Sequence, residues 1–379
     1  MTNPKTSVLD RSNELGSSSK SCSHRAAIGM TLSSVLLFGV AASISAAGWA
    51  QTLAEVQRPK APLHLESVGS FFVGGHSVSR TTTEVGLYDG GSIELDQMYV
   101  QFMVPQRHPN PPIVMVHGGA LSGKSFETTP DGRMGWYEYF VRKGFPTYVV
   151  DQVGRARSGF DPAPFNSVRA GTASPSTQPA VRRVSTERAA VRFRIGPEGG
   201  TTFADSQFPA SAVTELAKQT VPDLDGAGAT DDASVKALAD LSGQLSGVIL
   251  LGHSQAGPYP IDAALRDRSV VRAIIAVEPP GCKATTYSDA QIAKLSKTPV
   301  LIVFGDHIDA PQRIGVVQWT DALSDCRKFA ERLKASGGNV TLFHLPELGI
   351  RGNSHMMMQD RNNLQIADLI IGWIRREVR

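Results

Sequence analysis

One serine lies in a sequence context that favours nucleophilic chemistry. The apolar run 248–252 leads into "GHSQA" (252–256), which matches the pattern G-x-S-x-[GA] around Ser254. After a strand, this pattern predicts a sharp turn into a helix, which raises the serine hydroxyl above the sheet and requires small neighbours. The backbone N–H of Gln255 would then lie at a helix start, where a developing negative charge is stabilised. Pro258 and Pro260 are compatible only with the first turn of that helix.

A serine nucleophile needs a base, and the base needs an acid that orients it. When a nucleophile follows a strand in this way, the chain order is serine, acid, histidine. His355 lies in "GNSHMMMQ", between the last expected strand and the closing helix, which is the expected position of the base. Glu278 ends the strand after the serine and is the preferred acid. Asp306 and Asp309, at the end of the next strand, are the alternative acids.

A second glycine-rich stretch is compatible with two different chemistries. Within "VMVHGGALSGKSF" (114–126), residues 118–125 match the phosphate-binding pattern G-x-x-x-x-G-K-[ST]. The same stretch contains "HGG" after a strand, the loop that supplies an oxyanion donor in lipases and esterases. A phosphate loop requires a helix that begins at its Lys-Ser pair, but "FETTPDGRMGW" follows, with Pro130 and a turn. We therefore interpret the stretch as an oxyanion loop and expect no nucleotide partner.

Taken together, these stretches resemble the α/β-hydrolase superfamily. Within it, the chain is similar to a small group of secreted bacterial esterases often called "novel bacterial esterase". The matching stretches span nearly all of the chain after the N-terminal leader, and their order is specific. The matching stretches are "FFVGG" (71–75), "QMYVQFMVP" (97–105), "HGGALSGKSFETTPDGRMGW" (117–136), "VVDQVGRARSG" (149–159), "GHSQAG" (252–257), "VEPPG" (277–281) and "GNSH" (352–355).

The resemblance implies a serine esterase that works without a metal or cofactor. In this group the acid is a glutamate after the strand that follows the nucleophile, which corresponds to Glu278. The oxyanion donors correspond to the backbone N–H groups of Gly119 and Gln255. Some relatives carry larger residues where this chain has Gly119 and Ala120. The alternatives are the same triad acting on a lactone, an amide or a polyester, and a non-catalytic binding protein on this fold.

The expected secondary structure is typical of an α/β-hydrolase fold. Short apolar strands alternate with helices after residue 110, which indicates a mostly parallel sheet covered by helices on both faces. Two earlier strands, at 68–75 and 95–105, can add an antiparallel edge. The other strands are expected at 111–119, 146–154, 248–254, 270–281, 298–309 and 339–346, and the main helices at 135–144, 233–247, 320–338 and 363–378.

Residues 155–230 interrupt this alternation. The segment is rich in Ser, Thr, Pro and Gly, and it is longer than one strand–helix unit requires. We interpret it as an inserted cap, or lid, that sets substrate choice; the alternative is a disordered excursion. Phe160, Phe165 and Tyr259 are expected to line the substrate pocket.

The N-terminus predicts export. A polar leader ending at Arg25 precedes an uncharged apolar stretch, and Gly48 and Ala50 provide the small residues of a cleavage site before Gln51. We therefore expect a signal peptide at 1–50 and a mature hydrolase domain at 51–379, secreted or periplasmic. The alternative is an uncleaved membrane anchor, because about twenty apolar residues can span a bilayer.

Cysteine content and charge limit the other options. Cys282 and Cys326 remain after the leader; an oxidising compartment would allow them to pair, and the alternative is two separate buried thiols. Lys and Arg number 38 against 35 Asp and Glu, a net charge of +3, so no charge excess indicates a nucleic-acid partner. "GDHID" (305–309) has ligand-type residues, but such clusters more often cap a strand, and we expect no metal. A homodimer is compatible with the sequence.

Overall fold

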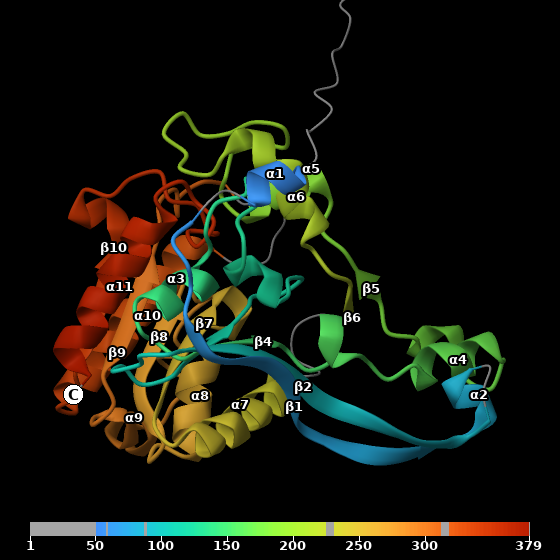
Figure 1. Ribbon diagram of the computed structural model, residues 1–379. Coiled ribbons are helices and arrows are strands. Elements are labelled where there is room, and N and C mark those ends of the chain that lie inside the picture. Colours follow the sequence, from blue (N-terminus) through green and yellow to red (C-terminus); the bar gives the residue numbers. More distant parts are fainter. Residues whose placement is uncertain (1–50, 58–59, 87–88, 225–230, 312–317, 379) are drawn as a thin grey trace, which may run out of the picture. The chain divides into compact units, whose positions relative to one another are not determined.

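The computed structural model describes residues 51–57, 60–86, 89–224, 231–311 and 318–378. The expected signal peptide (1–50) lies outside the described residues, as does 225–230 of the expected insertion. All of the described residues belong to one compact unit, in which helices cover a central sheet (Figure 1). Among the helices that the structure describes, none is long and apolar enough to cross a membrane.

The central sheet has eight strands in the order β1-β2-β4-β3-β7-β8-β9-β10. β1 pairs antiparallel with β2, and β2 pairs antiparallel with β4, while the remaining neighbours are parallel. The expected antiparallel edge on a mostly parallel sheet is therefore confirmed. The strands are β1 (Leu65–Arg80), β2 (Gly91–Pro105), β3 (Ile113–Val116), β4 (Thr147–Asp151), β7 (Val248–His253), β8 (Val271–Val277), β9 (Val300–Phe304) and β10 (Val340–His344).

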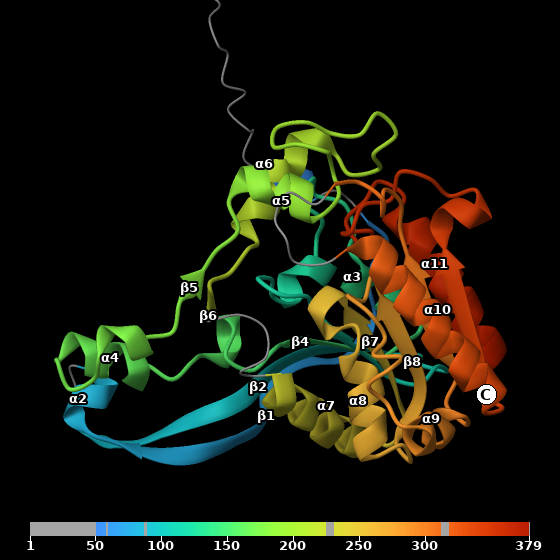
Figure 2. The same ribbon diagram turned by 180° about the vertical axis from the view of Figure 1, so that it is seen from behind.

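The inner strands are apolar throughout because both of their faces are covered. In β9, for example, Val300, Ile302 and Phe304 belong to a first hydrophobic core, and Leu301 and Val303 belong to a second. The two cores lie on opposite faces of the sheet, under different helices (Figures 1 and 2). The first core contains residues of α7 (Asp231–Leu245), α8 (Tyr259–Arg266), α9 (Asp289–Leu295) and α10 (Trp319–Ala335); the second contains residues of α3 (Trp136–Arg142) and α11 (Asn363–Glu377).

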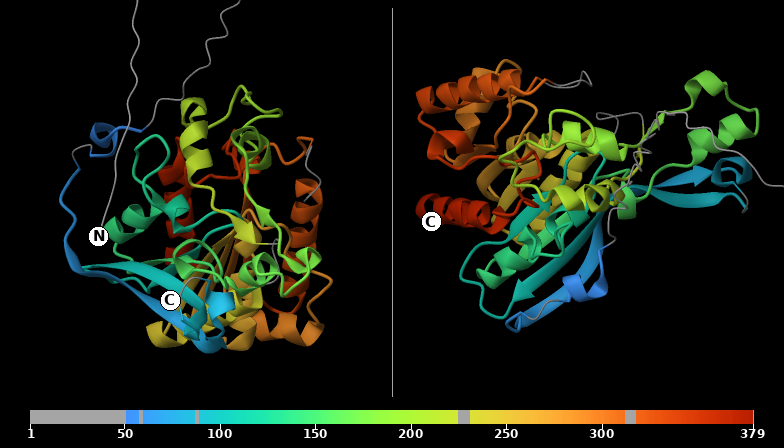
Figure 3. Two further views of the ribbon diagram at one scale, coloured as in Figure 1. Left: turned by 90° about the vertical axis from the view of Figure 1, so that its right-hand side faces the viewer. Right: turned by 90° about the horizontal axis from the view of Figure 1, so that it is seen from above.

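The insertion after β4 has two separate parts. Its first part carries α4 (Ala163–Arg169), which packs beside α2 (Thr82–Val85) at the far end of the β1–β2 hairpin (Figure 3, right). Its second part carries α5 (Thr186–Arg192) and α6 (Val213–Lys218), which bury Phe193 and Leu216 in the second core. Short β5 (Val181–Arg182) and β6 (Asp223–Leu224) pair antiparallel between the two parts. The described insertion is thus built from regular elements that pack onto the body and not from a disordered excursion.

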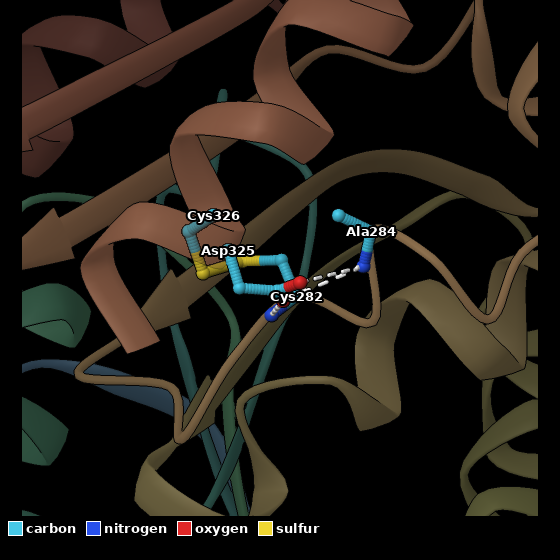
Figure 4. The surroundings of a disulfide bond; sticks show 4 residues. All are labelled: Cys282, Ala284, Asp325 and Cys326. Carbon is cyan, nitrogen blue, oxygen red and sulfur yellow. Dashed lines mark hydrogen bonds between the residues drawn. A yellow bond between two sulfur atoms is a disulfide. The ribbon is translucent and has the colours of Figure 1, made fainter. Parts of the chain in front are cut away.

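A disulfide connects the loop after β8 to α10. Cys282 and Cys326 are bonded, with a Cα–Cα distance of 4.7 Å (Figure 4). Next to the bond, the Asp325 carboxylate accepts the backbone N–H of Cys282 at 2.7 Å and that of Ala284 at 3.2 Å. The sequence left open whether the two cysteines pair or are separate buried thiols, and in the structure they pair. The bond and the carboxylate fix the loop that begins at the end of β8.

Removing the disulfide should destabilise the fold. The chain-entropy model gives a loss of about 4 kcal/mol for a cross-link between residues separated by 44 positions. We expect the double variant Cys282→Ser, Cys326→Ser, in which neither partner is left as a lone thiol, to unfold at a clearly lower temperature than the parent. The measurement is thermal unfolding followed by circular dichroism. Equal melting temperatures for the variant and the oxidised parent would contradict the expectation.

Candidate active site

Ser254 lies at the sharp turn that the sequence predicts. β7 ends at His253, and Ser254 begins a single turn of 3-10 helix with φ of +55°, a conformation unusual for a residue other than glycine. A methyl group at Gly252 would lie 2.0 Å from the carbonyl oxygen of Ala256, so a side chain cannot be accommodated there. Ser254 is only partly buried. The turn therefore presents the hydroxyl at the carboxyl end of the sheet.

Three segments bring Ser254, His355 and Glu278 together. The Oγ of Ser254 lies 2.8 Å from Nε2 of His355, and Nδ1 of His355 lies 2.9 Å from Oε2 of Glu278. Glu278 follows directly after β8, and His355 lies in the loop between β10 and α11. Both side chains are almost completely buried. This arrangement can pass a proton from a serine hydroxyl to an oriented imidazole.

The two alternative acids do not lie at His355. The Asp306 carboxylate accepts the backbone N–H groups of Gly352 at 2.9 Å and of His307 at 2.8 Å, so it supports the loop that carries the histidine. Asp309 is exposed. Glu278 is therefore the carboxylate that contacts the imidazole.

Asp306 also belongs to a small cluster of residues of the types that bind metal ions. Asp205, Asp306 and His307 offer three atoms within 4.8 Å of one another. His307 Nε2 lies 2.9 Å from Asp205 Oδ1, and its ring stacks on Phe203. These contacts, together with the backbone bonds of Asp306, account for the cluster as a structural link between the insertion and the end of β9.

The surroundings favour a neutral imidazole beside a charged carboxylate. Burial lowers the pKa of His355, and the hydrogen bond with Glu278 offsets this only in part. Burial by itself raises the pKa of Glu278, but the Arg194 guanidinium and His355 outweigh it and hold that pKa well below its usual range. Burial also lowers the pKa of His253 to about 3, so its ring is neutral. Its Nε2 lies 2.9 Å from the carbonyl oxygen of His355, to which a neutral ring protonated there donates.

Residues that the sequence analysis did not identify hold the histidine loop. The buried Asp360 accepts the Ser354 hydroxyl at 2.7 Å and the Ser354 N–H at 2.8 Å. Burial raises the pKa of Asp360 to about 6. The backbone N–H of His355 donates to the carbonyl of Phe193 at 2.8 Å, and the Phe193 ring stacks on the imidazole. Nothing in the sequence pointed to these roles of Asp360 and Phe193.

The "HGG" loop lies against the nucleophile turn. A methyl group at Gly118 would lie 2.6 Å from Ser254 Cβ, and one at Gly119 would lie 2.6 Å from Gln255 Oε1. At Gly118 the backbone can approach this closely only because the residue is a glycine, whereas the atom next to Gly119 is the end of a side chain that can move. The Lys-Ser pair of the phosphate-binding pattern forms one turn of 3-10 helix (Gly123–Phe126), and the Lys124 ammonium donates to the carbonyl of Thr128. The helix that a phosphate loop requires does not begin there.

The end of the insertion fixes the "HGG" loop. Asp223, in β6, accepts the backbone N–H of Ala120 at 3.1 Å and pairs with the buried Arg155. The Val221 N–H donates to the carbonyl of Ala120 at 2.9 Å. Both polar groups of the Ala120 backbone are thus held by residues 221–223, and φ of Ala120 is +59°. Nothing in the sequence indicates this support.

The three residues expected in the substrate pocket lie in different places. Tyr259 is buried next to the nucleophile turn, where its hydroxyl and the Gln255 side chain both donate to Asp231. Phe160 and Phe165 pack on each other, with ring centres 5.9 Å apart. Phe165 belongs to α4, which the figures place at the hairpin end and away from β7 (Figures 1 and 3). The structure therefore brings Tyr259, but not the two phenylalanines, near Ser254.

Comparison with known proteins gives two informative relatives, while no protein-family model matches the chain. A solved structure, "The Atomic Resolution Structure of a Novel Bacterial Esterase", is 45% identical and superposes with a TM-score of 0.79. The match covers 85% of this chain and 99% of that one. "Probable secreted lipase phiG" from Fungal sp. (strain ATCC 74256) is 28% identical over 76% of this chain and 89% of that protein.

The Asp223–Arg155 pair should contribute strongly to stability. Truncating Asp223 to Ala leaves the buried guanidinium uncompensated, which should lower the free energy of unfolding by about 3 kcal/mol. The matched control is Asp232→Ala, because Asp232 forms an exposed pair with Arg266 and exposed pairs contribute little. Urea unfolding measures both. Similar losses in the two variants would show that the buried pair has no special role.

Proposed function

Because this chain belongs to the bacterial esterase family of α/β-hydrolases and is a carboxylic ester hydrolase, we propose that Ser254, His355 and Glu278 are its catalytic triad. The observation that carries the proposal is the continuous hydrogen-bonded line from Ser254 Oγ through His355 to Glu278, with distances of 2.8 and 2.9 Å. Such a line is the geometry that serine acyl transfer requires.

In the first half of the proposed reaction, the ester carbonyl carbon is attacked by Ser254 Oγ. The hydroxyl proton passes to His355 Nε2, and Glu278 stabilises the imidazolium that forms. The carbonyl oxygen becomes an oxyanion, which receives hydrogen bonds from the backbone N–H groups of Gly119 and Gln255. These donors lie in the "HGG" loop and the nucleophile turn, which pack against each other. The tetrahedral intermediate then collapses, and the imidazolium protonates the departing alcohol.

In the second half, water replaces the alcohol. His355 removes a proton from the water, the resulting nucleophile attacks the acyl-enzyme carbonyl, and Ser254 is released with its proton restored. Each step uses side chains and backbone groups of this chain, so the proposed reaction needs no metal or cofactor. The neutral imidazole, which burial favours, is the form that both halves require as a base.

We also propose that the mature enzyme works outside the cytoplasm. The proposal is supported by the apolar N-terminal stretch from which we expect a signal peptide at 1–50, by the Cys282–Cys326 disulfide, and by the similarity to a protein named as a secreted lipase. Disulfides form and persist mainly in oxidising compartments. N-terminal sequencing of the protein recovered from the periplasm or medium tests the proposal, and an intact leader on a membrane-bound product would contradict it.

The triad assignment predicts unequal effects of three substitutions. Ser254→Ala should lower kcat for a chromogenic ester by about 10⁴-fold or more, because the nucleophile is lost. Glu278→Gln should lower kcat strongly, since the imidazolium loses its charged partner. Asp306→Asn is the matched control and should not lower kcat strongly, since Asp306 bonds to backbone N–H groups and not to His355. An acetyl to long-chain ester series measures all three, and unchanged kcat in Glu278→Gln would refute the assigned acid.

The pH dependence follows from the lowered pKa of His355. The base must be neutral, so kcat/KM should fall as the pH decreases through the pKa of His355 in the free enzyme. Because burial lowers that pKa, the midpoint should lie below the ordinary value of 6.5. The measurement is kcat/KM from about pH 4 to 8, with circular dichroism at each pH as a check on folding. A midpoint above 6.5 in folded protein would contradict the expectation.

A further inference from the structure

A buried arginine of the insertion contacts the proposed catalytic acid. Arg194 follows α5 by two residues, and its Nη2 donates to Glu278 Oε1 at 2.6 Å. Its Nε donates to the carbonyl of Asp306 at 3.0 Å. Both side chains of the Arg194–Glu278 pair have no exposed surface. The backbone of Arg194 has φ of +50°, so this position is held in a conformation that non-glycine residues rarely adopt.

The two carboxylate oxygens of Glu278 have separate partners. Oε1 accepts Arg194 and the backbone N–H of Gly305, whereas Oε2 faces Nδ1 of His355. The guanidinium therefore fixes the plane of the carboxylate and leaves one oxygen for the imidazole. Among the described residues, it is also the only permanently charged cation that pairs with this carboxylate, because the His355 imidazole is neutral in the resting site.

The same segment holds the base. The carbonyl of Phe193 accepts the His355 N–H, and its ring stacks on the imidazole with centres 6.0 Å apart. The Arg194 guanidinium packs on the Trp319 ring at 4.7 Å, and that ring lies 4.5 Å from the imidazole. Two consecutive residues of the insertion thus contact the acid and the base.

Stability alone does not explain this arginine. The desolvation of a fully buried ion pair often cancels its attraction, and apolar replacements of such pairs can be neutral or stabilising. In addition, Nη1 of Arg194 is buried without a hydrogen-bond partner among the described residues, which is costly.

We propose that Arg194 is a positioning residue of the triad, which holds Glu278 charged and oriented toward His355. Through this contact, the reactivity of Ser254 depends on the packing of the insertion that carries Arg194. The inference rests on the proposed function and adds to it a residue that lies 84 positions from Glu278 in the chain. Arg194 acts through Glu278 and touches neither Ser254 nor the acyl group.

The positive charge of Arg194 gives the proposal a distinct signature. The guanidinium disfavours the imidazolium and so lowers the pKa of His355. Removing it should raise this pKa, and the acidic limb of kcat/KM should move to higher pH. A loss of folded enzyme would lower the rate equally at every pH and would leave the limb in place.

The test compares Arg194→Met and Arg194→Lys with the control Arg188→Met, which removes the same charge from an exposed position on α5. We expect Arg194→Met to lower kcat about 10- to 100-fold with little change in KM, since a hydrogen bond to a charged group is lost. The midpoint of its acidic limb should shift to higher pH. Arg194→Lys should restore part of the parent's kcat and part of the parent's midpoint, and Arg188→Met should resemble the parent in both. An unshifted limb in folded Arg194→Met would overturn the proposal.

A second comparison remains decisive if Arg194→Met does not fold. The double variant Arg194→Met, Glu278→Gln removes both charges of the buried pair, and it is compared with Glu278→Gln. If Arg194 acts through Glu278, the double variant should have the kcat of Glu278→Gln; a further tenfold loss in folded protein would overturn the proposal. The parent and Ser254→Ala are measured alongside. Activity that survives Ser254→Ala would reject the proposed function itself, a failure distinct from that of the arginine.

Discussion

The site depends on one buried charge, the carboxylate of Glu278. A charged carboxylate without exposed surface is very costly unless hydrogen bonds and opposite charge replace its water. Three segments far apart in the chain supply that replacement: Arg194 from the insertion, the Gly305 N–H after β9, and His355 from the loop before α11. The same three contacts that stabilise the buried charge also orient the carboxylate toward the imidazole. The energetic requirement and the catalytic geometry are therefore met by one set of bonds.

The parallel sheet explains why these segments can meet. β7, β8 and β9 are parallel neighbours, and Ser254, Glu278 and Gly305 directly follow their carboxyl ends, so the three residues lie at the same end of the strands. Ser254 and Glu278 both have φ near +55°, so each strand is followed by an abrupt turn that the packed surroundings must maintain. The disulfide helps by fixing the loop that follows Glu278 to α10. The insertion then completes the site. Arg194 and Phe193 contact Glu278 and His355, and Asp223 holds the backbone of the "HGG" loop at Ala120.

The parts of this arrangement that the sequence predicts are those with local signals. Apolar runs, glycine stops and the small residues around Ser254 identify the strands, the helices and the nucleophile turn, and chain order then points to Glu278 and His355. Arg194, Asp223 and Asp360 carry no such signal, because their roles arise from contacts between distant segments. The position of Phe160 and Phe165 could not be predicted for a related reason. Aromatic content indicates that a segment packs, but it does not indicate that α4 packs at the hairpin end.

Reaction with a fluorophosphonate tests whether Ser254 is a nucleophile made reactive by His355 and Glu278. The mature parent and Glu278→Gln are labelled, and the labelled peptide is identified by mass spectrometry. We expect a single adduct on Ser254 in the parent and much slower labelling of the same residue in the variant. Labelling of a different residue, or equally fast labelling of Ser254 in both proteins, would contradict this expectation.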